Sequence, residues 1–328
     1  MKIAFVGKGG SGKTTLSSLF IRYLAARRIP VTAVDADINQ HLGTALGLEE
    51  DEAAALPPLG ARLPLIKDYL RGDNPRIPSA EAMIKTTPPG SGSRLLRLTE
   101  ENPVFDACAR EVALGAGTAA RLLVTGPFTE EDLGVACYHS KTGAVELLLN
   151  HLVDGRDEYV VVDMTAGSDS FASGLFTRFD VTFLVVEPTR KGVSVYRQYR
   201  EYARDFGVTL HVVGNKVHGA EDVEFLRAHA GDDLLVTLGQ SDWVRALERG
   251  QQRPFAELEA VNQRALGSLY EAADAAYAHR DWERYTRQMV HFHLKNATSW
   301  GNERTGTDLA AQVDPGFVLR EAGSPQPA

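Results

Sequence analysis

Short apolar runs alternate with longer segments of helical periodicity along most of the chain. Several of the runs are apolar on both faces, as expected of strands in a parallel sheet that helices cover on both sides. The alternation therefore predicts an α/β fold, with one doubly wound, mostly parallel sheet spanning about residues 1–275. The predicted strands are residues 3–6, 31–34, 122–124, 159–162, 181–186, 210–213 and 234–236.

Two stretches depart from this pattern. Prolines at positions 57, 58, 64, 75, 78, 88 and 89 interrupt residues 48–120, and we predict that the proline-rich part is a loop or an insertion. Residues 95–98 and 111–114 of the same stretch can add two short strands. Residues 276–328 lack the alternation, so we predict a C-terminal extension that is helical or irregular, with disorder over about the last ten residues.

Composition narrows the classes of partner. Hydrophobic residues make up 44% of the 328 residues, enough for a sizeable core, and the formal net charge is −8. Nucleic acids and anionic membranes attract clustered Lys and Arg, and no basic stripe is evident, so neither is an expected partner. Two cysteines, with no signal-peptide pattern and no long apolar run, predict a cytoplasmic protein.

The first predicted strand runs directly into a glycine-rich loop, residues 7–15, with the sequence G-K-G-G-S-G-K-T-T. This is the phosphate-binding pattern G-x-x-x-x-G-K-[ST] in the strand–loop–helix context that it requires. Its backbone N–H groups can surround the phosphates, while Lys13 reaches the β- and γ-phosphate oxygens and Thr14 offers its hydroxyl to Mg²⁺. We therefore expect a nucleoside triphosphate to be held by Gly9, Gly10, Ser11, Gly12, Lys13, Thr14 and Thr15.

Carboxylates follow two of the predicted strands, at the edge where open α/β sheets bind ligands. Asp35 and Asp37 come directly after residues 31–34, and Asp163 follows residues 159–162. Phosphoryl transfer needs a group that orients the attacking water and groups that hold the hydrated metal, so these residues are candidates for both tasks. The alternative for Asp35 and Asp37 is that they only cap the next helix.

A candidate for base recognition follows the predicted strand at residues 210–213. The sequence there is Gly214-Asn215-Lys216-Val217-His218, and the Asn215 side chain can present both a donor and an acceptor to a purine. Proteins specific for guanine usually read N-K-x-D, with an aspartate where this chain has His218. We therefore expect Asn215 and Lys216 to contact ATP in preference to GTP.

The lysine at position 8 makes the loop similar to the deviant P-loop of the MinD/ParA superfamily. This superfamily includes the nitrogenase iron protein and the CooC-type ATPases that insert nickel into carbon monoxide dehydrogenase. The resemblance implies an ATP-dependent homodimer, in which Lys8 crosses the interface and touches the nucleotide of the partner subunit. It also implies that Asp37 positions the attacking water, that Asp35 supports the metal region and that Asp163 binds Mg²⁺ through water. Residues 238–244 resemble the second adenine-side loop of this superfamily but lack its usual proline.

The segment that distinguishes members of this superfamily contains Cys137 and His139. In the nitrogenase iron protein a cysteine at this place ligates an iron–sulfur cluster, but that cluster also needs a cysteine soon after Asp163, where this chain has none. The sequence C-Y-H resembles the metal-binding C-x-C of the CooC-type ATPases, with an imidazole replacing the second thiol. One Cys and one His from each protomer would give an S₂N₂ site suited to Zn²⁺ or Ni²⁺. The alternative is that Cys137 is a packing residue and His139 an ordinary polar surface residue.

Together these features favour a Mg-dependent ATPase whose nucleotide state switches a homodimer between two forms and acts on a client enzyme in metal-centre maturation. Charge on the transferred phosphate would be stabilised by Lys13, Mg²⁺ and Lys8 of the partner subunit. Two alternatives stay open: a positioning or partition switch that binds DNA or membrane in its ATP form, and an ATP-gated regulator that carries no metal.

Three smaller predictions concern packing. Cys108 is expected in the core, because no second cysteine lies near it in the sequence. Tyr196, Tyr199 and Tyr202 follow helical spacing and are expected to pack a helix rather than to stack on bases. The histidines at positions 291 and 293 are expected to be solvated rather than to bind a metal.

Overall fold

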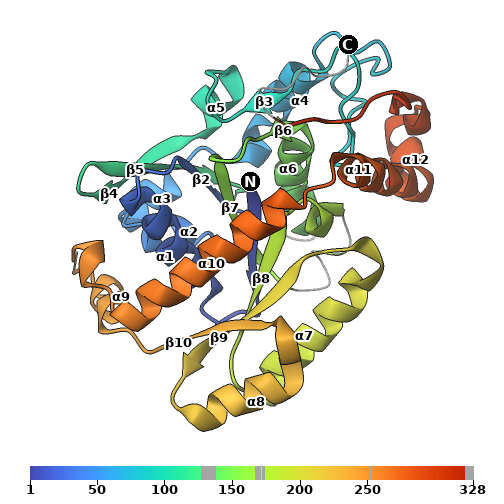
Figure 1. Ribbon diagram of the computed structural model, residues 1–328. Helices are drawn as coiled ribbons and strands as arrows, with labels where there is room; N and C mark the ends of the chain where they lie inside the picture. The colour runs from blue at the N-terminus through green and yellow to red at the C-terminus, as the bar shows by residue number, and fades with distance from the viewer. Residues whose placement is uncertain (127–137, 167–170, 172–173, 252, 322–328) are drawn as a thin grey trace.

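Eight strands form the main sheet of the described residues, in the order β10-β9-β8-β1-β7-β2-β5-β4. The computed structural model describes residues 1–126, 138–166, 171, 174–251 and 253–321, without the side chains of residues 138–141. All neighbouring strands of the sheet are parallel except the antiparallel pair β4 and β5, which confirms the predicted mostly parallel α/β fold (Figure 1). The strands of this sheet are β1 (Lys2–Gly7), β2 (Val31–Asp35), β4 (Arg110–Gly115), β5 (Thr118–Val124), β7 (Tyr159–Thr165), β8 (Val181–Val186), β9 (Leu210–Val217) and β10 (Leu234–Gly239). A separate parallel pair is formed by β3 (Leu96–Arg97) and β6 (Leu152–Val153).

Helices cover both faces of the sheet. Apolar side chains of α1 and α10 join one buried cluster with β1, and those of α6 and α7 join a second cluster on the opposite face. The longer helices are α1 (Lys13–Ala26), α4 (Leu63–Arg71), α6 (Tyr138–His151), α7 (Arg190–Ala203), α8 (Ala220–Ala230), α10 (Ala260–Ala278) and α11 (Trp282–Asn296). The shorter helices are α2 (Leu42–Ala45), α3 (Glu50–Ala54), α5 (Pro103–Cys108), α9 (Asp242–Leu247) and α12 (Asn302–Thr305).

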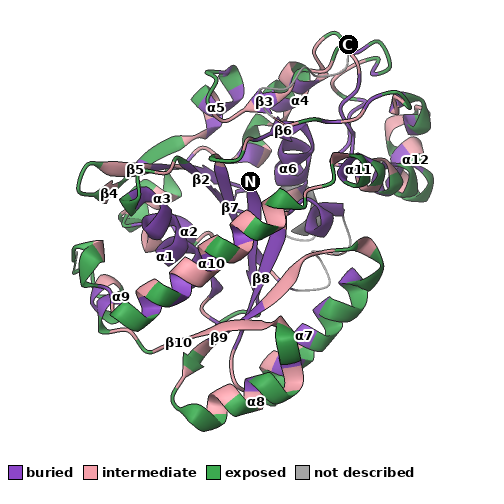
Figure 2. Ribbon diagram, viewed as in Figure 1, coloured by how far each residue is buried: buried purple, intermediate pink, exposed green. Residues whose placement is uncertain are grey.

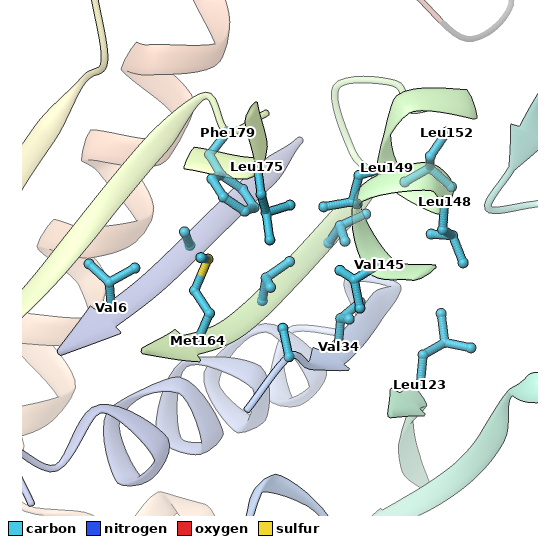
Figure 3. Close-up of a cluster of buried hydrophobic side chains, with 14 of the residues drawn as sticks. Val6, Val34, Leu123, Val145, Leu148, Leu149, Leu152, Met164, Leu175 and Phe179 are labelled. Atoms are coloured by element: carbon cyan, nitrogen blue, oxygen red, sulfur yellow. The ribbon is translucent and has the colours of Figure 1, made fainter. Parts of the chain in front are cut away.

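Alternation along β1 explains why the central strands are apolar on both faces. Successive side chains of a strand point to opposite sides of the sheet. Ala4 and Val6 therefore enter the cluster with α6, while Ile3 and Phe5 enter the cluster with α1. Figure 3 shows Val6 and Met164 on the α6 side, and Figure 2 shows the central strands buried beneath helices with exposed outer faces. Full burial of each such side chain contributes about 1.5–3 kcal/mol, so the central strands hold the loops at their carboxyl ends in fixed positions.

The insertion at residues 48–120 contains more regular structure than its prolines predict. The predicted strands near residues 96 and 111 are present as β3 and β4, but the proline-rich part also contains α4. Pro64 lies in the first turn of this helix, where the missing N–H is not needed. Ile66 and Leu70, four residues apart, are fully buried. Of the two alternatives, a loop was therefore wrong at α4, because proline in a first turn is compatible with a helix.

The C-terminal extension packs against the sheet domain, and its predicted helical and irregular character is confirmed. Tyr285 and Met289 of α11 form a small core with Phe317 and Leu319, and a π-helical turn, Ala297–Gly301, joins α11 to α12. The predicted domain boundary near residue 275 falls within α10 and stays a prediction. The predicted disorder falls mostly on residues 322–328, which lie outside the described residues. None of the described helices has the length and apolar character needed to cross a membrane.

The packing predictions are confirmed in part. Cys108 is in the core, and Tyr196 and Tyr199 are buried, whereas Tyr202 is 42% exposed. The expectation of a solvated histidine is wrong for His293, which is fully buried. Its Nε2 lies 2.9 Å from the carbonyl oxygen of Leu309 and its Nδ1 lies 3.3 Å from Thr86 Oγ1. Because a carbonyl can only accept, Nε2 carries a proton, and burial lowers the pKa of His293, which favours the neutral imidazole.

Stability should fall in acid because of a second buried histidine, His151. Its Nδ1 lies 3.0 Å from the carbonyl oxygen of Leu147, and burial lowers the pKa of His151 to about 4. The unfolded chain takes up this proton near pH 6.5 and the folded chain does not, so the stabilisation is complete above that pH and is lost as the pH falls towards 4. The shift corresponds to about 3 kcal/mol. We expect urea unfolding at pH 7 and pH 4.5 to show a smaller loss of stability for His151→Asn than for wild type, while exposed His41→Asn keeps the wild-type loss. Equal losses in all three proteins would contradict a neutral buried His151.

Candidate nucleotide-binding site

The glycine-rich loop joins the end of β1 to the start of α1. Gly10 and Gly12 have φ of 84° and 87°, in the left-handed region where glycine is favoured. A Cβ at Gly12 would also lie 2.2 Å from Asn215 Nδ2, so a side chain there would displace Asn215. Gly12 is the N-cap of α1 and has no side chain with which to cap the first turn. The free N–H groups and the positive end of the helix therefore favour an anion at the loop.

The predicted catalytic residues meet beside this loop. Lys13 Nζ lies 2.7 Å from Asp37 Oδ2 and 3.5 Å from Asp163 Oδ1. The Thr14 hydroxyl donates to Asp163 Oδ2 at 2.6 Å. Parallel pairing of β2 with β7 places Asp35 directly beside Asp163. Residues from three separate parts of the chain thus converge at one edge of the sheet.

Burial and mutual repulsion of the carboxylates govern the charges here. Burial, and then the Asp163 charge, raise the pKa of Asp35 to about 7, and burial raises the pKa of Asp163 despite Lys13. Burial alone would lower the pKa of Lys13, but Asp163 and Asp37 outweigh it and keep the ammonium charged. Burial acts to raise the pKa of Asp37, but its hydrogen bond with Lys13 outweighs this and lowers it. Three carboxylates thus face one lysine.

The site has the donors that Mg²⁺ requires. Oxygen ligands and retained waters are typical of Mg²⁺ sites. Asp163 Oδ1 is buried and has no hydrogen-bond partner among the described residues, although Lys13 lies nearby. No group of three His, Cys, Asp or Glu side chains in the described parts of the chain is arranged to bind a metal ion. Thr14 and Asp163 supply oxygen donors that would hold a Mg²⁺ ion together with the phosphates.

Asp35 and Asp37 have different surroundings. Asp35 is fully buried, and its oxygens accept from the backbone N–H of Asp37 at 3.1 Å and of Leu42, the first residue of α2, at 2.9 Å. Asp37 Oδ1 accepts from the backbone and side-chain nitrogens of Asn39, while Oδ2 faces Lys13. Of the two carboxylates, Asp35 alone thus accepts a hydrogen bond from the first residue of the next helix, as the alternative interpretation expected of both. Asp35 holds the turn that presents Asp37 to the loop.

The candidate base-recognition residues contact the loop from the end of β9. Asn215 Nδ2 donates to the Ser11 carbonyl at 2.8 Å, and Lys216 Nζ donates to the Gly10 carbonyl at 2.6 Å. Lys216 has a φ of 57°, which is unusual for a residue with a side chain and typical of a functional turn. A cavity of about 260 Å³ lies between Asn215, the start of α1 and residues 238–241. The segment resembling a second base-side loop therefore borders the same cavity as Asn215.

Two charged residues at this edge were not predicted from the sequence. Glu187 Oε1 accepts from Lys216 Nζ at 2.6 Å, and the neighbouring ammonium of Lys191 lowers the pKa of exposed Lys8. Both residues follow β8, whose carboxyl end lies at the edge where ligands bind. Their position after a predicted strand was the one feature of the sequence that could have marked them as site residues. Because no motif marks these residues, the contacts could be found only from the folded structure.

The predicted transition-metal ligands cannot be placed. Cys137 lies outside the described residues, and although His139 belongs to α6, its side chain is not described. The interfacial Zn²⁺ or Ni²⁺ site therefore stays a prediction.

The P-loop class of nucleotide-binding proteins is defined by a strand, a glycine-rich loop and a helix in succession. The loop carries a lysine, and carboxylates follow the adjacent strands. The CobQ/CobB/MinD/ParA nucleotide binding domain family matches residues 3–274. The chain belongs to this family, in agreement with the resemblance of its loop to that of MinD/ParA proteins.

Individual relatives agree with this assignment. An uncharacterised ATP-binding protein of Methanocaldococcus jannaschii is 32% identical over 235 residues, which cover 71% of this chain and 81% of that protein. The carbon monoxide dehydrogenase accessory protein CooC of Rhodospirillum rubrum is 28% identical over 253 residues, which cover 77% of this chain and 87% of that protein. The cell division ATPase MinD of Pyrococcus furiosus has a similar structure, with a TM-score of 0.53 at 17% identity over 84% of this chain and 98% of that chain. At this identity the MinD structure supports the fold alone.

Proposed function

We propose that the protein binds ATP with Mg²⁺ and hydrolyses it slowly, as a homodimeric switch. The observation that carries this proposal is the meeting of Lys13, Thr14, Asp37 and Asp163 beside a loop in which Gly10 and Gly12 adopt left-handed φ values. Lys13 would pair with phosphate oxygens when the nucleotide binds. In the structure Asp37 is its ion-pair partner instead. Bound Mg²⁺ would neutralise charge on the phosphates.

Asp37 is proposed to orient the attacking water and accept its proton. It is the carboxylate nearest to Lys13, and Asn39 fixes its other oxygen with two hydrogen bonds. A charged group held in this way contributes by positioning and by proton transfer. Lys13 would stabilise the charge that develops on the leaving oxygens.

ATP rather than GTP is the proposed nucleotide. The Asn215 amide nitrogen is engaged by the Ser11 carbonyl, so its oxygen remains to accept from the exocyclic amine of adenine. His218 occupies the place of the aspartate that would accept from guanine. In calorimetric titrations of Asp37→Asn, a variant chosen to limit turnover, we expect Mg-ATP to bind at least about tenfold more tightly than Mg-GTP. Equal affinities, or a preference for Mg-GTP, would refute this choice of base.

The proposed dimer depends on Lys8. Its side chain lies on the surface beside the loop, where Lys191 repels it, and a phosphate of the partner subunit's nucleotide would offer a counter-charge. Closure of two such faces would complete both sites at once. Nucleotide state would then set the population of the closed form.

The proposed role of the switch is metal-centre maturation of a client enzyme. The relation to CooC of Rhodospirillum rubrum supports this role, as does the Cys137-Tyr138-His139 sequence. We expect untagged protein dialysed against Zn²⁺ or Ni²⁺ in the presence of Mg-ATP to retain about half a metal ion per chain, since two protomers would share one site. Cys137→Ser and His139→Ala should each lose this metal, whereas Cys108→Ala in the core should keep it. Failure of the unaltered protein to retain metal would favour the metal-free regulator.

A further inference from the structure

A second and larger cavity, of about 820 Å³, lies between the insertion, α6 and the C-terminal extension. It shares no lining residue with the base-side cavity. Its far wall comes from residues 296–307, which follow the family-matched residues 3–274. Figure 1 shows α11 and α12 beside the region of α6 that forms another wall. Nothing in the proposed ATPase reaction uses this cavity.

The walls of the cavity are held together by buried polar contacts. His293 of α11 contacts Thr86 and the Leu309 carbonyl, as described above. Gln312 is buried, and its side-chain nitrogen donates to the Ala82 carbonyl at 2.9 Å while its oxygen accepts from Thr87 Oγ1 at 3.2 Å. These contacts join the insertion to the extension beside the cavity. A preformed cavity of this size is typical of sites for small organic ligands.

The cavity has an apolar interior. Leu63 and Trp300 contribute partly exposed apolar side chains to its lining, and Met83 and Leu147 lie fully buried behind them. Trp300 lies in the π-helical turn, and its indole nitrogen donates to Asn296 Oδ1 at 2.9 Å, which fixes the ring. Such turns recur at functional sites, because the extra residue displaces a side chain from its regular helical position. The indole gives the interior a flat apolar surface.

Three basic residues line the same cavity: Lys67, Lys85 and Arg304. None of them has an ion pair within the described parts of the chain, and Glu81 is the single acidic residue of the lining. Burial, and then the Arg304 charge, lower the pKa of Lys67. The Arg304 guanidinium carbon lies 5.7 Å from the centre of the Trp300 ring. Three cationic side chains thus lie beside an apolar surface, and the lining contains one carboxylate to balance them.

We propose that this cavity binds a small organic anion, with its apolar body against Leu63 and Trp300 and its acidic group between Lys67 and Arg304. The anion would relieve the repulsion between the two cations, and its body would remove apolar surface from water. A carboxylate with an aliphatic or aromatic body has this chemistry. The volume admits a ligand of several fused rings or a medium-length chain.

The test uses the full chain saturated with Mg-ADP, so that the nucleotide site is occupied. The probe is 8-anilinonaphthalene-1-sulfonate, an aromatic anion whose fluorescence rises in apolar surroundings, and octanoate and octanol are the competitors. We expect one saturable site per chain, with displacement of the probe by octanoate at concentrations where octanol has no effect. The double variant Lys67→Met/Arg304→Met should bind the probe at least about tenfold more weakly. Its thermal unfolding temperature should not fall, because two like charges have been removed.

The matched control is Lys295→Met/Arg287→Met, which makes the same charge change on α11 away from the cavity lining and should bind as wild type does. Thr307→Trp fills the cavity while keeping all its cations, and it should also abolish the site. Three results would each overturn the proposal: no saturable binding to wild type, unchanged binding to the Lys67/Arg304 double variant, or equal displacement by octanol and octanoate. The last would indicate an apolar cavity without anion recognition.

Discussion

Replacing Asp37 with asparagine is expected to slow ATP hydrolysis by about 10²–10⁴-fold while the protein still binds Mg-ATP. The amide has nearly the shape of the carboxylate, but it cannot accept the proton of the attacking water. It also removes the 2.7 Å ion pair with Lys13, so Lys13 becomes freer to bind phosphate. Single-turnover hydrolysis and a binding titration on the same preparation would separate the two effects.

The matched control for this experiment is Asn39→Ala. Asn39 fixes Asp37 Oδ1 through its backbone and side chain, and the substitution removes only the side-chain hydrogen bond. We expect a smaller loss of hydrolysis than for Asp37→Asn, because the carboxylate remains. If Asp37→Asn hydrolysed ATP at the wild-type rate, the general base would have to be another residue, and the proposed mechanism would be wrong.

The largest expected loss of stability follows from Asp154→Asn. Asp154 is fully buried, with Lys2 Nζ at 3.1 Å and Arg280 Nη2 at 2.7 Å, and Arg280 also pairs with Asp180. These cations outweigh the effect of burial and hold the pKa of Asp154 far below its usual range. Removing one partner of a buried ion pair leaves an uncompensated charge, which costs about 3–5 kcal/mol. Urea unfolding at pH 7 would measure the change.

An exposed ion pair supplies the comparison. Arg156 Nη2 lies 3.2 Å from Asp274, and the two side chains are 62% and 39% exposed. Asp274→Asn should therefore cost about 1 kcal/mol or less. The combination Asp154→Asn/Lys2→Met should recover part of the lost stability, because it removes one of the stranded cations. If Asp154→Asn and Asp274→Asn cost the same, burial would not make the ion pairs of Asp154 more costly to break than an exposed pair.

Local patterns were sufficient to predict the sheet. The central strands are apolar on both faces and are flanked by helices, so their positions follow from periodicity alone. Their ends were less certain: β7 continues to Thr165 and β9 to Val217, because polar site residues extend both strands beyond their apolar centres. The helix at Leu63–Arg71 was missed because Pro64 was read as a breaker of regular structure, although it lies in the first turn.

In the site, too, residues in local motifs could be predicted, whereas contacts between distant parts of the chain could not. Lys13, Thr14, Asp37 and Asp163 could be predicted because each follows a strand or belongs to a contiguous motif. The pairing of Lys216 with Glu187 and the approach of Lys191 to Lys8 depend on how β8 and β9 lie beside the loop. Burial of His293 depends on its contact with Thr86, which is more than 200 positions away in the sequence. Such contacts have no local signature, so they require the folded structure.

The measurement that tests the central claim most directly is the mass of Asp37→Asn by size-exclusion chromatography with light scattering, in Mg-ATP and in Mg-ADP. A nucleotide-driven switch predicts twice the chain mass of 35.7 kDa in Mg-ATP and a single chain in Mg-ADP. Adding Lys8→Ala should prevent the dimer, while adding Lys295→Ala should not. A single chain in both nucleotides, or a dimer that is indifferent to nucleotide and to Lys8, would contradict the proposed switch.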